Sequence, residues 1–291
     1  MMTVKKAFKA VVAQAVIVFV LAGLSSCGPR TADAYYFRGS EFAANKQYDK
    51  AAADFTKALE IDPAHYNSYN KRGQIYGNTK RYELALADFD KMIELAPGNG
   101  TGYNHRGYLY TIQGDTDKAI EEYTRAVEAD PAFFLSYYNR AQMYVRKQET
   151  AKAIDDYTRA LEINPGFELA VFSRGQAYSK DGMYEEAVAD YTRALELKSA
   201  IETYYSRAKA YEGLGEYDKA IADYKKIIEI APENIPAVDE VSRLITELGD
   251  KKASMAEEEL SGAGYTTDSG EYTSSGAEYT TERGADFTTS R

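Results

Sequence analysis

Cysteine, tryptophan and histidine are nearly missing from this sequence. The 291 residues include one cysteine, two histidines and no tryptophan. A single cysteine excludes an intramolecular disulfide framework, and no Cys/His spacing of a zinc site occurs. Neither His65 nor His105 has a recognisable nucleophile partner in the sequence. Since there is also no phosphate-binding loop, we expect neither a metal, a cofactor nor an enzymatic activity.

Net positive charge is also missing. The formal charge is −10 at pH 7. An acidic body repels phosphate backbones, so nucleic acid is excluded as the expected partner.

Long apolar runs are absent except near the N-terminus. Three lysines (5, 6 and 9) precede the run Ala10 to Leu24, which is interrupted only by Gln14. This run is shorter than the roughly 20 residues that span a bilayer. Because small residues follow it, residues 1–26 are predicted to be a secretory signal peptide.

The stretch Leu24-Ser25-Ser26-Cys27 resembles the lipobox of bacterial lipoproteins. The resemblance implies that Cys27 becomes the first residue, carries lipid and holds the protein on a membrane. Residues 27–31 would be the anchored linker, and Gly28 after the cysteine favours the outer membrane. The alternative is an uncleaved N-terminal anchor with a buried thiol.

Proline is scarce as well, but five of the seven prolines are regularly placed, at 63, 97, 131, 165 and 232. An Arg-Gly or Arg-Ala pair recurs with them, at spacings of 34, 34, 34, 34 and 33 residues. Such a fixed period indicates a repeat architecture. The blocks are 32–65, 66–99, 100–133, 134–167, 168–200 and 201–234.

Each block contains two apolar stripes with helical spacing. Counting places from the first residue of a block, apolar or small residues occupy places 4, 8, 11 and then 20, 24, 27. This i, i+4, i+7 pattern predicts two helices, and a polar or glycine break separates them. Proline stops the second helix, so every block is expected to be a helical hairpin.

A period of 34 residues with small residues at places 8 and 20 and aromatic residues at 11 and 24 resembles the tetratricopeptide repeat (TPR) family. The resemblance implies an all-α, right-handed superhelical solenoid of six hairpins over residues 32–234. Residues 235–250 are predicted to form a C-terminal capping helix with one apolar face. Residues 251–291 are expected to be a disordered tail rich in Gly, Ser, Thr and Tyr. Its spaced aromatic residues could bind a partner or the protein's own groove.

Arginine occupies place 7 in all six blocks, and an acid occupies place 23. An acidic polymer could bind such an arginine row, but pairing inside each hairpin explains the co-occurrence better. The expected pairs are Arg38 with Asp54, Arg72 with Asp88, Arg106 with Glu122, Arg140 with Asp156, Arg174 with Asp190, and Arg207 with Asp223.

Resemblance to TPR stacks implies that the first helix of each hairpin lines a concave face. Amides and aromatic rings predominate at its places 5 and 9, which favours an extended peptide over simple hydration. The Lys/Asn/Arg set of carboxylate-clamp TPR proteins is missing. The expected groove residues are Tyr36, Asn70, Gln74, Asn104, Tyr108, Tyr138, Gln142, Phe172, Gln176, Tyr205 and Lys209.

These features together predict a non-catalytic, membrane-anchored scaffold or adaptor of the bacterial cell envelope. Its partner would be another envelope protein or peptide segment bound in the concave groove. The alternative is an accessory or carrier protein that binds a small ligand beside an envelope transporter.

Overall fold

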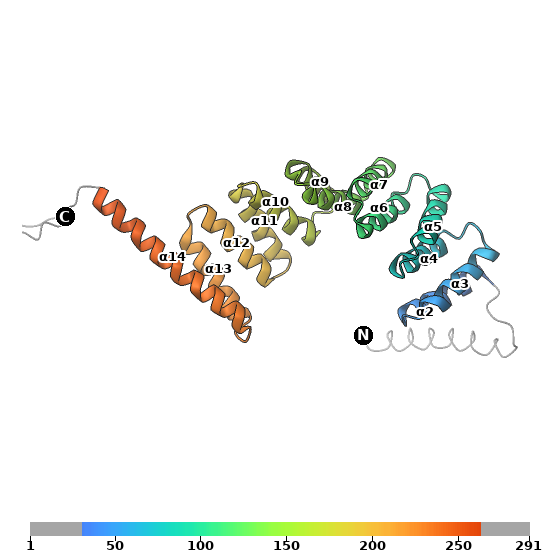
Figure 1. Ribbon diagram of the computed structural model, residues 1–291, viewed down its shortest axis with the longest axis horizontal. Helices are drawn as coiled ribbons and strands as arrows, with labels where there is room; N and C mark the ends of the chain where they lie inside the picture. Colours follow the sequence, from blue (N-terminus) through green and yellow to red (C-terminus); the bar gives the residue numbers. More distant parts are fainter. Residues whose placement is uncertain (1–30, 263–291) are drawn as a thin grey trace, which may run out of the picture.

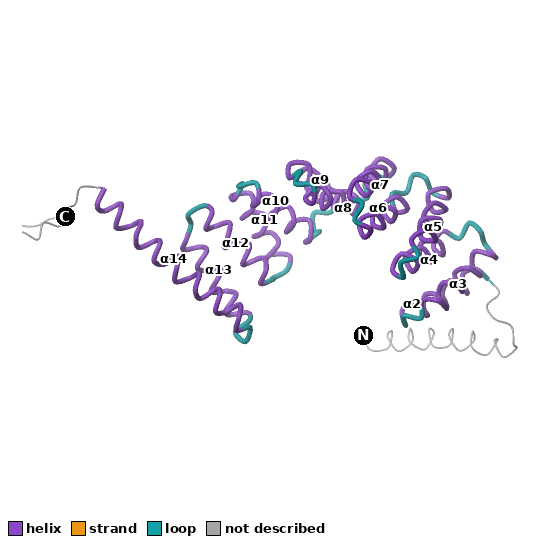
Figure 2. Tube along the Cα trace, viewed as in Figure 1, coloured by secondary structure: helices purple, strands orange, loops and turns teal. Residues whose placement is uncertain are grey.

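Thirteen helices and no strand make up residues 31–262, the part of the chain that the computed structural model describes. The first twelve pair into six antiparallel hairpins that follow one another along a curved rod (Figures 1 and 2). The pairs are α2 (Ala32–Ala44) with α3 (Tyr48–Ile61), α4 (Tyr66–Asn78) with α5 (Tyr82–Leu95), α6 (Thr101–Gln113) with α7 (Thr116–Ala129), α8 (Phe134–Arg146) with α9 (Thr150–Ile163), α10 (Glu168–Lys180) with α11 (Tyr184–Leu197), and α12 (Ile201–Gly213) with α13 (Tyr217–Ile230). The predicted all-α fold of six hairpins and a final helix is confirmed.

In every hairpin, the residue at place 15, in the turn between the two helices, has a left-handed backbone conformation. Three of these residues are glycines, as expected at a helix end that needs positive φ. The other three are Lys46, Lys80 and Gln148, with φ between 57° and 61°. The glycine breaks were visible in the sequence, whereas these three positions show that the turn geometry persists without glycine.

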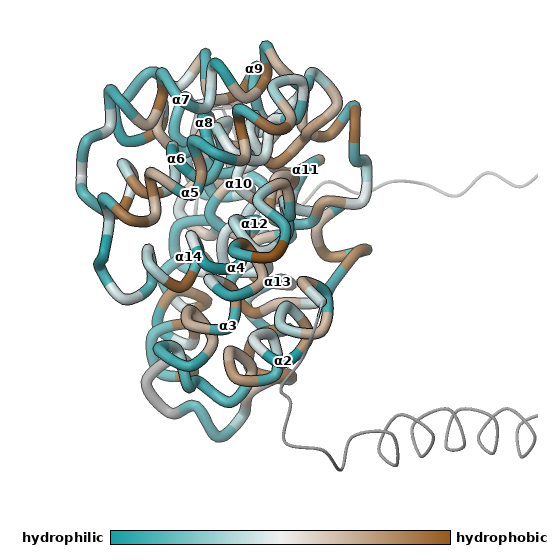
Figure 3. Tube along the Cα trace, turned by 90° about the vertical axis from the view of Figure 1, so that its right-hand side faces the viewer, coloured by the Kyte–Doolittle hydropathy of each residue, from teal (hydrophilic) through white to brown (hydrophobic). Residues whose placement is uncertain are grey.

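The core is built from small residues that receive rings. Gly107 on α6 faces Tyr123 on α7, and a Cβ at Gly107 would lie 2.6 Å from Cε1 of that ring. Ala119 and Tyr123 are fully buried, and Met143 of the next hairpin packs on them. Each hairpin therefore completes its core with its neighbour, as repeat proteins do. Figure 3 looks along the rod and shows apolar segments on helices of several hairpins.

The six arginines lie beside their acidic counterparts on the facing helix of the same hairpin. Arg140 shows the usual geometry, in which Nε and Nη2 donate to Oδ2 and Oδ1 of Asp156, both at 2.7 Å. The same two-bond contact joins Arg38 to Asp54, Arg72 to Asp88, Arg174 to Asp190, and Arg207 to Asp223.

The arginines also connect successive hairpins, a contact that the repeat pattern did not predict. Nη1 of Arg140 donates to Oγ1 of Thr124 in the preceding hairpin at 3.1 Å. Arg72, Arg174 and Arg207 reach Thr56, Thr158 and Thr192 in the same way. A threonine at place 25 is therefore part of the joint between repeats.

The third hairpin departs from this pattern. Its acid is Glu122, and place 25 of the preceding block is Asp90 instead of threonine. Arg106 makes one hydrogen bond to Glu122 at 3.0 Å and another to Asp90 at 2.8 Å. Nε of Arg106 and Oε2 of Glu122 are buried without a hydrogen-bond partner. Arg106 therefore contacts the expected Glu122 and, in addition, an acid of the preceding hairpin.

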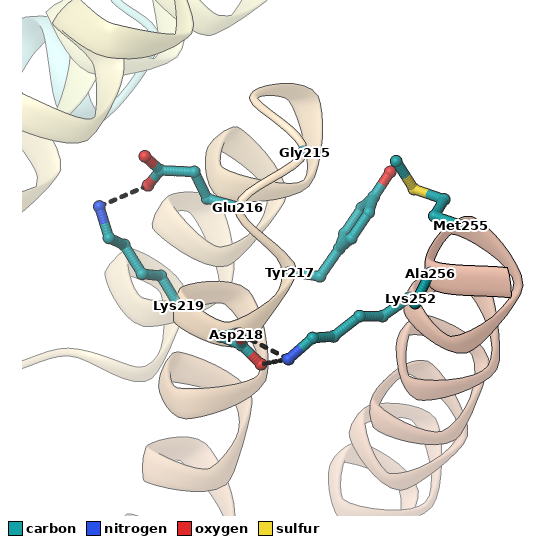
Figure 4. Close-up of a pocket in the computed structure, with 8 residues that line it drawn as sticks. All are labelled: Gly215, Glu216, Tyr217, Asp218, Lys219, Lys252, Met255 and Ala256. Atoms are coloured by element: carbon teal, nitrogen blue, oxygen red, sulfur yellow. Dashed lines mark hydrogen bonds and ion pairs between the residues drawn. The ribbon is translucent and has the colours of Figure 1, made fainter. Parts of the chain in front are cut away.

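The last helix, α14 (Ile235–Gly262), is longer than the predicted cap. It continues past residue 250, so residues 251–262 are helical and not part of a disordered tail. Lys252 Nζ contacts Asp218 Oδ1 and Oδ2 at 2.6 and 2.7 Å, and this contact holds α14 against the start of α13 (Figure 4). The ion pairs of Arg243 with Glu240 and Glu247 lie on exposed side chains of α14.

None of the helices within residues 31–262 has the length and hydropathy needed to cross a membrane. Cys27 and the signal-peptide prediction lie outside the described residues, as do residues 263–291.

Candidate functional site: a cavity in the inner face

An aromatic ring at place 5 packs at an inclined angle against the ring at place 24 of the same hairpin in four repeats. Ring centroids are 5.7 to 5.8 Å apart in these pairs. They are Tyr36 with Phe55, Tyr138 with Tyr157, Phe172 with Tyr191, and Tyr205 with Tyr224. The predicted groove aromatics are thus partly used to cover the core.

The second and third repeats have Asn70 and Asn104 at place 5, which are too small to cover the ring below. A cavity of about 460 Å³ opens there between α4, α6 and α8. Phe89 forms part of its wall, and His105 stacks on Phe89 at 4.9 Å with an interplanar angle of 30°. The lining residues are Gly73, Gln74, Gly77, Asn78, Phe89, Asn104, His105, Tyr108, Leu109 and Asn139.

Side-chain hydrogen bonds hold the polar part of this wall. Gln74 Nε2 donates to Asn70 Oδ1 at 2.6 Å and lies 3.3 Å from Nε2 of His105. Across the cavity, Nδ2 of Asn139 and Oγ of Ser136 donate to Oδ1 of Asn104 at 2.9 and 3.2 Å. The amides are therefore positioned by α4, α6 and α8 together.

The cavity wall carries no formal charge at neutral pH. Burial, together with the smaller effect of the nearby charge of Lys71, lowers the pKa of His105 to about 4. A neutral imidazole with an amide neighbour can donate or accept one hydrogen bond at each nitrogen. The wall combines neutral hydrogen-bonding groups with the faces of Phe89 and Tyr108. This combination suits an uncharged or aromatic side chain better than an ion.

The predicted groove residues divide into three groups. Gln74, Asn104 and Tyr108 line the cavity, although Asn104 is only 7% exposed and its carbonyl oxygen is already used. Tyr205 lines a second, more apolar cavity of about 680 Å³ between α12, α13 and α14. The remaining residues contact neighbouring side chains. Asn70 accepts a hydrogen bond from Gln74, Gln142 donates one to Tyr138, and Lys209 pairs with Glu212. Gln176 lines a small cavity with Ser173, while Tyr36 and Phe172 pack against core rings.

The cavity and the contribution of Phe89, Gly77 and Asn139 to its wall were not predicted from the sequence. The available signal was the consecutive Asn70 and Asn104 where other repeats carry rings. Gly77 was a second signal, because a Cβ there would lie 3.0 Å from Cδ2 of Leu109. No group of three or more His, Cys, Asp or Glu side chains within residues 31–262 is placed to hold a metal ion.

Comparison with known proteins agrees with the hairpin architecture. Profiles described as "Tetratricopeptide repeat" match residues 32–65, 134–167, 170–199 and 201–234, and also 55–87. A profile described as "TPR repeat" matches 107–148. No curated protein sequence matches the chain.

Solved structures share the fold at low sequence identity. YrrB, described as a TPR protein with an unusual peptide-binding site, is 24% identical with a TM-score of 0.54, covering 64% of this chain and 96% of YrrB. The pilF protein of Pseudomonas aeruginosa is 16% identical with a TM-score of 0.60, covering 73% and 97%. PilW, described as a widely conserved type IV pilus biogenesis factor, is 17% identical with a TM-score of 0.58, covering 75% and 99%.

The matched repeat segments, the order of the hairpins and the shared fold therefore lead to one assignment: the chain belongs to the tetratricopeptide repeat family of non-catalytic protein-interaction scaffolds.

Proposed function

We propose that this protein is a lipid-anchored scaffold of the bacterial cell envelope that binds a segment of another envelope protein in its concave face. The observation that carries the proposal is the uncharged cavity opened by Asn70 and Asn104 on the inner face. Its polar groups can pair with a peptide backbone, while Tyr108, which is 51% exposed, offers a ring for a partner side chain. The peptide-binding site of YrrB is a precedent on the same fold.

The proposed anchor is lipid on Cys27. Thr31 caps α2, so the linker of residues 27–31 spans at most about 18 Å. The first hairpin would then lie close to the membrane, with the groove extending away from it. PilW and pilF share the fold, and PilW is named a pilus biogenesis factor, which supports an envelope role. The outer membrane is the membrane favoured by Gly28.

The anchor is tested by changing Cys27 to Ala and following lipid labelling and membrane fractionation in cells. We expect a variant that is unlabelled and either unprocessed or released from the membrane. A variant that fractionates and migrates like the unchanged protein would contradict lipid attachment.

The groove is tested by placing a photo-crosslinking amino acid at Tyr108 in intact bacteria. Leu84 on α5 is the matched control, because it is 50% exposed and lies on a second helix instead of an inner one. We expect a discrete crosslinked protein from Tyr108 and none from Leu84. Equal products from both positions, or none from either, would argue against a partner in the groove.

The cavity volume of about 460 Å³ also lies within the range of small-ligand sites. A carrier beside an envelope transporter is therefore the second candidate. Native mass spectrometry of the purified protein separates the two: a co-purifying small molecule lost in the Tyr108→Ala variant would favour the carrier.

A further inference from the structure

The inner face of the middle four hairpins bears positive charge and no acid. At the inner-face places 2, 5, 6, 9, 12 and 13 of these hairpins, the charged residues are Lys71, Arg146 and Lys180. All three are exposed, and none forms an ion pair with another residue of the described chain. In a chain of net charge −10, this surface is locally suited to an acidic segment.

The C-terminal residues, outside the described part of the chain, have the complementary composition. Residues 263–291 contain five acids and two arginines. The sequence acid–aromatic–threonine occurs in them three times, at 271–273, 278–280 and 286–288. Each motif therefore offers one negative charge beside one ring, which is the combination that Lys71 and the adjoining uncharged cavity can accommodate.

We infer that the inner face binds the acid–aromatic–threonine motifs of residues 263–291 from a second copy of this chain. This inference rests on the peptide groove proposed above. The aromatic side chain enters the cavity beside Tyr108 and Phe89, where it buries apolar surface against their rings. The acid before it pairs with exposed Lys71, which lies on α4 three residues before the cavity residue Gln74. The amides of Gln74 and Asn139 lie where the motif's backbone passes.

The position of the tail favours a second copy over the same molecule. Gly262 ends α14 at the opposite end of the rod from α4, and α14 points away from the hairpins (Figure 1). Tyr272 follows Gly262 by ten residues and reaches at most about 35 Å from it, whereas Phe287 follows by 25 residues and reaches at most about 90 Å. The hairpins α10/α11 and α12/α13 separate α14 from the cavity. Within one molecule the longest reach belongs to the last motif alone, whereas the groove of a second copy is open to all three motifs.

Tail-into-groove binding joins different surfaces of the two molecules. Such a head-to-tail contact leaves a free tail on one molecule and a free groove on the other, so it permits chains of molecules and not only pairs. Anchoring in one membrane would raise the local concentration of grooves and tails. We therefore expect self-association that grows with protein concentration.

The test measures the mass of the full chain in detergent by sedimentation over a wide concentration range. We expect the mass to rise with concentration for the full chain and to stay constant for a chain ending at Gly262. Tyr108→Ala and the combined change of Tyr272, Tyr279 and Phe287 to Ala should each abolish the rise. Leu84→Ala, at an equally exposed outer position, should leave it unchanged.

A labelled peptide of residues 263–291, titrated into the chain ending at Gly262, supplies the direct affinity. We expect Tyr108→Ala and Lys71→Glu each to weaken binding at least about tenfold, because each removes one half of the motif's contacts. Lys225→Glu, an exposed outer lysine, should change the affinity less than twofold, which is within measurement error.

Each other outcome has one meaning. A full chain that stays monomeric while the peptide binds assigns the groove to the molecule's own tail and overturns binding between copies. A peptide that does not bind overturns the inference altogether. If crosslinking from Tyr108 then still captures another envelope protein, the proposed scaffold function stands. If it captures nothing, both fail.

Discussion

Arg140 on α8 donates two hydrogen bonds to Asp156 on α9 and a third to Thr124 on α7. One guanidinium thus joins the two helices of its own hairpin to the hairpin before it. The side chains of Arg140 and Asp156 are 15% and 9% exposed, so most of the contact is shielded from water. Breaking it therefore has a different cost from breaking a surface ion pair.

We predict that Asp156→Ala lowers the free energy of unfolding by about 3–5 kcal/mol, because it leaves a buried guanidinium without its acid. The double change Arg140→Met with Asp156→Ala should cost less than the sum of the single changes. Urea denaturation of the four proteins gives the coupling energy. Glu162→Ala, in the exposed pair with Arg159, is the control and should cost at most about 1 kcal/mol. Additive losses would contradict direct pairing.

The mismatched third repeat offers a stabilising change. Glu122→Asp together with Asp90→Thr restores the residues that the other repeats use around their arginines. The pair should regain hydrogen bonds at Arg106 Nε and at the carboxylate, both now incomplete. We expect a gain of about 1–3 kcal/mol in urea unfolding. The regular joints already carry Asp and Thr at these places, so Asp90→Thr alone serves as the control and should gain less than the double variant.

His105 should make stability depend on pH. Its native pKa of about 4 lies below the ordinary value of 6.5, so the unfolded chain binds the proton more strongly. Stability is therefore full above pH 6.5 and falls as pH decreases toward 4, by up to about 3 kcal/mol. Proton NMR titration of the two histidines measures the pKa directly. His105→Gln should flatten the stability profile over this interval, and an unaltered profile would contradict the prediction.

The turn residue Gln148 has a left-handed backbone with φ of 61°. Gln148→Gly should raise the unfolding free energy by up to about 1 kcal/mol, because glycine adopts this conformation without a Cβ clash. Gln113→Gly, one place earlier in its own turn and at the end of α6, should lower it by a similar amount. Thermal melting of both variants gives the comparison; a loss at both sites would show that the turn tolerates glutamine without strain.

Periodic residues made the fold predictable. Arginine at place 7, small residues at places 8 and 20 and rings at place 24 each recur because every hairpin repeats the same packing. Pairs such as Arg174 with Asp190 were likewise visible, since both members recur with one spacing. Local rules of this kind act through neighbours in the sequence or in the next repeat, and one chain contains six examples of each.

Exceptions to the period were harder to interpret. Asn104 was expected to present its amide to a peptide, but Ser136 and Asn139 of the next hairpin use its oxygen. The cavity lies where the ring at place 5 is missing, and the imidazole of His105 stacks on Phe89 in its wall. Such outcomes depend on side-chain directions between repeats. The C-terminal boundary of α14 was not predicted for a similar reason. Lys252 of α14 pairs with Asp218, which lies 34 residues earlier in the last hairpin.

The substantial helix contacts within the described chain reach no farther than the adjacent hairpin. Small rotations at the five interfaces between successive hairpins therefore add up along the rod while the core of each hairpin stays packed. The pitch of the inner surface can lengthen or shorten by elastic deformation. A tensile load on the C-terminal end would pass through every one of these joints, including the one between α5 and α6, where Arg106 shares its contacts between Glu122 and Asp90.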